Sequence, residues 1–140
     1  MIVGKINNGI VLDHIKAGNS MKLYSILNLE KVENTVAIIK NVRSNKMGKK
    51  DMIKIDELID LNLDVLGYVD PGITVNIIKD GKLDTKYHLE LPDRVTGVIK
   101  CDNPRCITST EQELPHIFKL TDRENGVYRC IYCEAKAKKQ

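Results

Sequence analysis

All four cysteines of this 140-residue chain lie in two short stretches, CDNPRC at residues 101–106 and CIYC at residues 130–133. Each short spacing lets two thiolates converge from one turn, and two such turns can close on one tetrahedral metal ion. Zinc prefers thiolate ligands, and four of them leave no open coordination position. The spacing therefore predicts one structural zinc ion per chain, held by Cys101, Cys106, Cys130 and Cys133.

The sequence leaves three other interpretations of these cysteines open. They are four buried thiols without a metal, a redox dithiol formed by Cys130 and Cys133, and a rubredoxin-type iron site with the same ligands. The dithiol would leave the partner pair, Cys101 and Cys106, unexplained. The unequal spacing of the two pairs makes the iron site less favoured than zinc.

A break in the pattern near Pro92 divides the chain. After it we expect a strand at Val95–Lys100 and a hairpin whose turn is Glu124-Asn125-Gly126 and whose second strand carries CIYC. A piece as short as residues 93–140 seldom holds together on its own core and needs a crosslink such as zinc. We therefore expect two domains, residues 1–92 and residues 93–140, the second being small, all-β and zinc-ribbon-like.

Residues 1–92 alternate between strand and helix patterns. Runs rich in β-branched residues predict strands, and capping residues predict two helices, one starting at Asn19 or Ser20 and one capped by Asp56. Asp80-Gly81 is a strong hairpin signal. The expected strands are residues 2–6, 10–15, 35–42, 51–55, 73–79 and 82–89, and the second helix spans residues 57–66. This order predicts an α+β fold with the helices on one face of a largely antiparallel sheet.

The composition excludes several classes of protein. Hydrophobic residues make up 42% and charged residues 29%, which is typical of a folded globular chain. No apolar run approaches the roughly 18 residues that a membrane span needs, and the first residues lack the features of a signal peptide. We expect a soluble, cytoplasmic protein without membrane contact, in which reduced cysteines favour metal over disulfides.

The charge balance bears on the partners. The net charge is only +3, there is no Trp and there is a single Phe. The chain therefore lacks a strong positive field, and stacking platforms for bases are scarce. These features count against the main rival interpretation, a zinc-ribbon nucleic-acid-binding protein. A second rival is a thiol-redox enzyme. We find no glycine-rich phosphate loop and no nucleophile–base pair, so nothing indicates catalysis.

Several polar residues stand at notable places in the cysteine-free part. Asp13-His14 ends an otherwise apolar strand, and Lys50 and Lys54 share one face of another strand. Asn76 and Lys86 lie on the two strands of the predicted hairpin. Such a face could hold an anionic ligand with a ribose, because lysines bind phosphates while carboxylates and amides bind hydroxyls and base edges. The plainer alternatives are a solvated lysine face and a turn at Asp13-His14, with His88 and His116 as surface or packing residues.

Four motifs together resemble one known family. They are GIVLDHI at residues 9–15, MGKKDMIKI at 47–55, ITVNIIKDGKL at 73–83 and the two cysteine pairs. In order and spacing, from Ile2 to Glu134, they resemble the regulatory chain of aspartate carbamoyltransferase. The resemblance implies a subunit of de novo pyrimidine biosynthesis without an active site. It implies a ferredoxin-like allosteric domain for nucleoside triphosphates, with CTP inhibiting and ATP activating and with Mg²⁺ as a possible companion.

The same resemblance implies the partners. The zinc domain would contact the catalytic chain, regulatory chains would pair through their N-terminal domains, and three such dimers would join two catalytic trimers. Asn103 and Glu134 match positions at the contact with the catalytic chain.

The resemblance also assigns the nucleotide site residue by residue. Asp13 and Lys54 match positions that hold ribose and base, and His14 and Lys86 match positions near the phosphates. The further matches are Lys50 as an additional basic residue, Asn76 and Ile78 as pocket-lining residues, and Ile6, which would meet the base through its backbone.

The sequence departs from the family pattern in a few places. Gly81 stands where an aromatic residue can lie beside the base, and Gly4 replaces a larger polar residue near the pocket. Arg105 and Ile131 differ at the contact with the catalytic chain. We expect base discrimination and the partner surface to differ accordingly.

Overall fold

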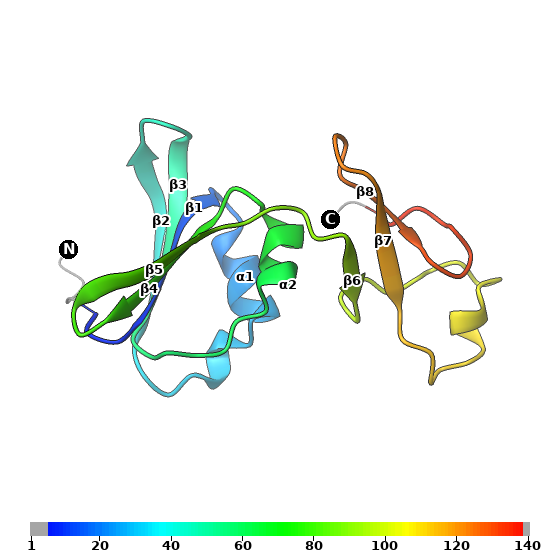
Figure 1. Cartoon of the computed structure of the whole chain (residues 1–140), viewed down its shortest axis with the longest axis horizontal. Coiled ribbons are helices and arrows are strands. Elements are labelled where there is room, and N and C mark those ends of the chain that lie inside the picture. Colours follow the sequence, from blue (N-terminus) through cyan, green and yellow to red (C-terminus); the bar gives the residue numbers. More distant parts are fainter. Residues whose placement is uncertain (1–5, 139–140) are drawn as a thin grey trace. The chain divides into compact units, whose positions relative to one another are not determined.

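The computed structural model describes residues 6–138, which divide into two compact units, one ending at Glu90 and one starting at Leu91 (Figure 1). Most of the strand expected at residues 2–6 lies outside the described residues, and Ile6 itself is in no regular element. Among the helices of the described part, none is long and apolar enough to cross a membrane.

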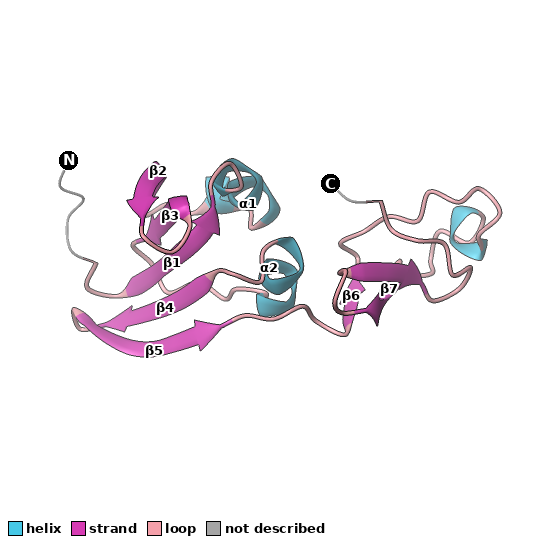
Figure 2. Cartoon of the chain, turned by 90° about the horizontal axis from the view of Figure 1, so that it is seen from above, coloured by secondary structure: helices cyan, strands magenta, loops and turns pink. Residues whose placement is uncertain are grey.

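The first unit is a five-stranded antiparallel sheet in the order β2-β3-β1-β4-β5. Figures 1 and 2 show α1 and α2 on one face of this sheet. Along the chain, helices follow β1 and β3. The first four strands lie in the order β2-β3-β1-β4, which is the ferredoxin-like arrangement. The α+β prediction is therefore confirmed. The elements are β1 (Gly9–Lys16), α1 (Ser20–Ile26), the 3₁₀ helix η1 (Leu29–Lys31), β2 (Val36–Ser44), β3 (Gly48–Ile55), α2 (Leu63–Val69), β4 (Thr74–Lys79) and β5 (Lys82–His88).

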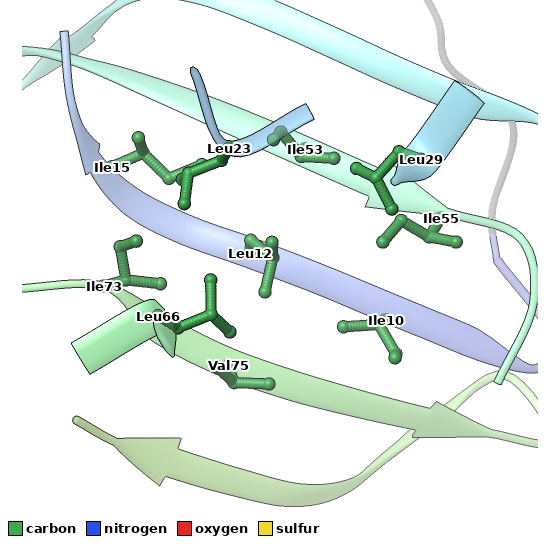
Figure 3. Packing of buried hydrophobic residues seen from close by; sticks show 10 residues of the cluster. All are labelled: Ile10, Leu12, Ile15, Leu23, Leu29, Ile53, Ile55, Leu66, Ile73 and Val75. Carbon is green, nitrogen blue, oxygen red and sulfur yellow. The ribbon is translucent and has the colours of Figure 1, made fainter. Parts of the chain in front are cut away.

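The core of this unit lies between the sheet and the helices (Figure 3). Its buried members are Ile10, Leu12, Ile15, Leu23, Leu29, Ile53, Ile55, Leu66, Ile73 and Val75. Strand β3 alternates as the sequence predicts. Ile53 and Ile55 face the core, which puts Lys50, Met52 and Lys54 on the opposite face of the sheet.

The second helix starts later than predicted. Instead of beginning at Glu57 under an Asp56 cap, α2 begins at Leu63, where the Asn62 side chain accepts hydrogen bonds from the N–H groups of Asp64 at 3.1 Å and Val65 at 3.2 Å. The N–H of Asp56 donates instead to the carbonyl of Thr35 at 2.9 Å. This bond ties the end of β3 to the chain that leads into β2, so the acidic residues after Ile55 lie in a loop.

The second unit is a three-stranded antiparallel sheet in the order β6-β7-β8. Strand β6 (Arg94–Thr96) is shorter than the predicted Val95–Lys100, because Gly97 turns the chain at a φ of +73° and donates to the carbonyl of His116 at 2.8 Å. The hairpin predicted around Glu124-Asn125-Gly126 is present. Its strands are β7 (Ile117–Asp122) and β8 (Val127–Cys130), and the short helix η2 (Ile107–Ser109) precedes them.

Candidate functional site

The four cysteines form one cluster in the second unit. Cys101 and Cys106 bound a loop after β6, Cys130 ends β8, and Cys133 lies in the turn that follows. All four Sγ atoms lie within 4.8 Å of one another. The Sγ atoms of Cys101 and Cys133 are 3.7 Å apart and those of Cys106 and Cys130 are 3.8 Å apart. These distances rule out disulfides, whose sulfur–sulfur bond is about 2.05 Å.

The cluster has the geometry of a tetrahedral metal site. Thiolates bound to zinc at about 2.3 Å stand roughly 3.8 Å from one another at the corners of a tetrahedron. The two closest sulfur pairs match this spacing. The four cysteines therefore fit a metal ion of this kind, and their number leaves no position for a substrate.

Two neighbouring side chains support the cysteines. The hydroxyl of Thr108 donates to Cys106 Sγ at 3.1 Å. This bond, followed by a backbone hydrogen bond from Thr108, outweighs burial and lowers the pKa of Cys106 to about 7. His116 accepts a bond from the N–H of Cys101 through Nδ1 at 3.1 Å. Burial raises the pKa of Cys101 to about 12. Four thiolates therefore need a cation to coexist here at neutral pH.

The structure also brings several of the predicted polar residues together on the outer face of the first sheet, opposite the helices. Val11 on β1 is paired with Lys54 on β3 and with Asn76 on β4, and Asn76 is paired with Lys86 on β5. Directly paired residues in antiparallel strands point to the same face. We call the residues Lys54, Asn76 and Lys86 the polar row.

A β-bulge places Asp13 and His14 beside this row. One extra residue in β1 lets both Leu12 and Ile15 face the core, and Asp13 and His14 occupy the bulge between them. His14 adopts a φ of +58°, and its Nδ1 lies 3.1 Å from the Thr74 hydroxyl. A positive φ at a residue other than glycine is uncommon and clusters at functional sites.

Asp13 and Lys50 form an ion pair of 2.9 Å between β1 and β3. Burial alone would raise the pKa of Asp13, but the bonds from Lys50 Nζ and from the N–H of His14 outweigh it and lower the pKa. Asp13 is therefore an ionised acceptor at neutral pH. Lys50 partly neutralises it and holds its carboxylate in place.

The two remaining residues assigned to the nucleotide site are Ile78 and Ile6. Ile78 is paired with Gly9 and with Leu83, so it shares the outer face. Ile6 is half-buried just before Asn7, whose carbonyl accepts a 2.9 Å bond from the N–H of Gly81 in the β4–β5 turn. This bond holds the chain next to Ile6 against the β4–β5 turn. That turn contains Gly81, which stands where the family can have an aromatic residue beside the base.

Asn103 and Glu134 lie on the two cysteine loops. The Asn103 side chain accepts a bond from the N–H of Arg105 at 3.1 Å, and Glu134 has a φ of +65° and donates its N–H to the carbonyl of Cys130 at 2.9 Å.

Sequence reasoning did not identify Thr74, Thr108 or the role of His116. The position of Thr108 two residues after Cys106 was the one available signal. Thr74 and His116 reach their partners through tertiary contacts.

Comparison with known proteins agrees with this geometry. Residues 1–90 match the family described as aspartate carbamoyltransferase regulatory chain, allosteric domain, and residues 93–140 match the metal binding domain of the same chain. The regulatory chain from Clostridium acetobutylicum is 52% identical over 134 residues, which cover 96% of this chain and 92% of that one. The regulatory chain from Clostridium tetani is 52% identical over 96% of this chain and 94% of that one. The one from Bifidobacterium longum is 41% identical over 99% of each.

Both matched domains are described as allosteric or metal-binding, and the relatives are named regulatory chains, in agreement with a non-catalytic subunit. The chain belongs to the family of aspartate carbamoyltransferase regulatory chains.

Proposed function

We propose that CTP and ATP compete for the outer face of the five-stranded sheet and regulate a catalytic chain that is held by the zinc domain. In this proposal residues 1–92 are the nucleotide-binding domain and residues 93–140 are the zinc domain. The protein acts in the cytoplasm, in de novo pyrimidine biosynthesis. CTP inhibits and ATP activates.

The observation that carries the nucleotide site is the gathering of the polar row and the Asp13–Lys50 pair on one sheet face. Lysines act as point charges for phosphates, so Lys86, together with His14 on β1, suits the triphosphate, with Mg²⁺ as a possible companion. Asp13 and Lys54 suit the ribose and the base. The other residues assigned to the pocket are Ile6, Lys50, Asn76 and Ile78.

The proposed metal is zinc, because its preferred ligands and bond length fit the cysteine cluster. Bound there, zinc would crosslink the two cysteine loops and allow all four thiolates to be ionised. The loops carry Asn103 and Glu134, which we propose as contacts with the catalytic chain. In the assembly, regulatory chains pair through their N-terminal domains and three such dimers join two catalytic trimers.

Regulation then follows from unequal binding. A nucleotide shifts the balance between two states of an assembly only by the difference in its affinity for them. CTP and ATP share one site in this proposal, so opposite effects require that they prefer opposite states. The catalytic chain in turn changes the nucleotide affinity by the same factor.

Calorimetric titration of the zinc-loaded protein with CTP, followed by ATP, tests the nucleotide site. We expect saturable CTP binding that ATP displaces and that Lys54→Ala abolishes. Lys46→Ala removes an exposed charge from the β2–β3 turn and serves as the matched control, which should bind like the wild type. Absence of binding by the folded, zinc-loaded wild type would refute the nucleotide site.

A further inference from the structure

The chain that links the two units is tied down on both sides of a single residue, Glu90. Before it, Leu89 packs against the core of the first unit. After it, Leu91 is the first residue of the second unit. Glu90 itself is exposed, and within residues 6–138 it takes part in no hydrogen bond or ion pair. Its backbone is therefore held by neither unit through a polar contact.

Two side chains of the β7–β8 hairpin hold the segment that follows Glu90. Arg123 in the turn donates from Nη1 to the Leu91 carbonyl and from Nη2 to the Asp93 carboxylate, both at 2.8 Å. The buried hydroxyl of Tyr128 on β8 donates to the Pro92 carbonyl at 2.6 Å. We call these three bonds the linker clamp.

The clamped segment is also stiff by itself. Leu91 precedes a proline, which restricts it mostly to extended conformations. Pro92 is buried and has a fixed φ. The Asp93 carbonyl accepts a further bond of 2.8 Å from the N–H of Leu120 on β7. The whole segment should therefore move with the second unit, which leaves the backbone of Glu90 to take up any rotation.

The strand that carries Lys86 leads directly into this link. Lys86 is assigned to the triphosphate in the proposed nucleotide site, and its strand, β5, ends at His88. β5 is an edge strand, paired with β4 alone in its sheet. Hinges are typically a few residues at the end of an element, where they take up a change in φ and ψ. A shift of β5 would reach Glu90 with no loop in between to absorb it.

We propose that Glu90 is the hinge between the two units and that the linker clamp makes this hinge a one-residue coupling from the nucleotide site to the second unit. The inference rests on the proposed function, since it takes the nucleotide as the signal. It adds the route, which runs along β5, through the backbone of Glu90 and through Arg123 and Tyr128 into the β7–β8 hairpin. A longer link would leave both units intact and would absorb the signal.

The first test lengthens the link without touching either unit. Gly-Gly-Ser is inserted between Glu90 and Leu91, and the zinc-loaded variant is assembled with catalytic trimers from the same organism. CTP affinity and zinc content should match the wild type, because both cores and the linker clamp are kept. The maximal effect of CTP on catalytic activity should fall at least about five-fold, because Gly/Ser-rich linkers are flexible. The matched control is the same insertion after Lys46, in the β2–β3 turn, which should keep the effect of CTP.

The second test loosens the clamp through one side chain. Arg123 is half-exposed, so Arg123→Gln should fold, and glutamine cannot reproduce both bonds of the guanidinium. We expect the maximal effect of CTP to fall at least about two-fold while CTP affinity and trimer association stay unchanged. A merely structural role of Arg123 would lower stability and leave the effect of CTP as it is. Glu90→Gln should behave like the wild type, because the hinge uses the backbone of Glu90 rather than its side chain.

The outcomes separate the hinge from the proposed function. If the wild type responds to CTP and both the insertion at Glu90 and Arg123→Gln respond equally, the coupling is wrong while the proposed function stands. If the insertion abolishes CTP or zinc binding, the link is part of one unit and the hinge is wrong.

A wild-type assembly that binds CTP without a change in activity would refute both the proposed regulation and the coupling. The position of the hinge is then decided by NMR relaxation of the backbone amides of the zinc-loaded chain. The amides of Leu91 and Asp93 should tumble with those of the β7–β8 hairpin. If they tumble with those of β4 and β5 instead, the position of the hinge is wrong as well.

Discussion

Ser20, at the start of α1, donates its hydroxyl proton to the carboxylate of Asp51 on β3 over 2.6 Å, and both residues are fully buried. The same carboxylate accepts bonds from the N–H groups of Gly18 at 3.1 Å, Ser20 at 3.3 Å and Asn41 at 3.0 Å. Asp51 therefore ties three segments together. They are the turn before α1, the first residue of α1 and Asn41, which lies at the register shift between Ile39 and Val42 in β2.

Asp51→Asn should destabilise the first unit. An amide retains one acceptor oxygen and turns its NH₂ toward an N–H donor, so at least one buried group loses its partner. We expect a loss of about 2–3 kcal/mol in the free energy of unfolding, typical of bonds to a buried charged group. Urea unfolding at pH 7 measures this loss. The control Asp84→Asn, on exposed β5, should change stability by less than about 0.5 kcal/mol. An equally small effect at Asp51 would contradict the prediction.

The contribution of Asp51 should disappear in acid. Burial would raise its pKa, but the bonds from Ser20 and from the three backbone N–H groups outweigh it, so the pKa lies below the ordinary 3.8. A lowered folded-state pKa gives stability that is present above the unfolded pKa and lost as the pH falls through the folded one. The stability difference between wild type and Asp51→Asn should therefore be constant above about pH 5 and shrink as the pH falls below the ordinary carboxyl pKa of 3.8. A difference that stays constant down to pH 2.5 would exclude this account.

Asp13→Asn should weaken CTP binding at least ten-fold and leave the fold intact. The substitution removes the charge that Lys50 holds in place and, in the proposed site, weakens an acceptor for a ribose hydroxyl. Asp13 and Lys50 are partly exposed, so the loss of their ion pair should cost less than about 1 kcal/mol of stability. Calorimetric titration with CTP and urea unfolding of the same sample separate the two effects. Asp84→Asn, which removes the exposed Asp84–Lys79 pair, is the matched control.

The parts of this structure that follow from local sequence could be predicted, and the parts that depend on tertiary contacts could not. The cysteine spacing locates the cluster because each pair closes within its own turn. The alternation of β3 places Lys50 and Lys54 on the outer face because the period of a strand is two. The bulge at Asp13-His14 emerges only from the register of β1 against β3.

The predicted start of α2 at Glu57 was wrong because it, too, depended on a tertiary contact. The acidic residues after Ile55 resemble a first helical turn, and the bond from Asp56 to Thr35 that holds them in a loop is tertiary. One partner of the cysteine cluster is tertiary in the same way, since His116 lies far from Cys101 in sequence.

Removal of the metal should unfold the second unit before the first. The second unit has a small buried layer around Val95, Phe118 and Tyr128, whereas the first unit has a larger core of its own. Metal binding to such a domain is coupled to its folding. In excess chelator, NMR signals from the β7–β8 hairpin should collapse while those of β1 and β3 persist. Hairpin signals that survive in excess chelator would contradict the crosslinking role of the metal.

Thr108→Val should weaken metal binding without removing a ligand. The Thr108 hydroxyl stabilises the thiolate of Cys106 through a 3.1 Å bond, and valine keeps the shape of the buried side chain but cannot donate. Loss of such a supporting bond typically lowers metal affinity about 10–100-fold. Competition with a chelator of known zinc affinity measures the change. The control is Thr110→Val, which removes an exposed hydroxyl that bonds to the carbonyl of Ile107. If both variants hold zinc as tightly as the wild type, the hydroxyl of Thr108 does not support the ligand.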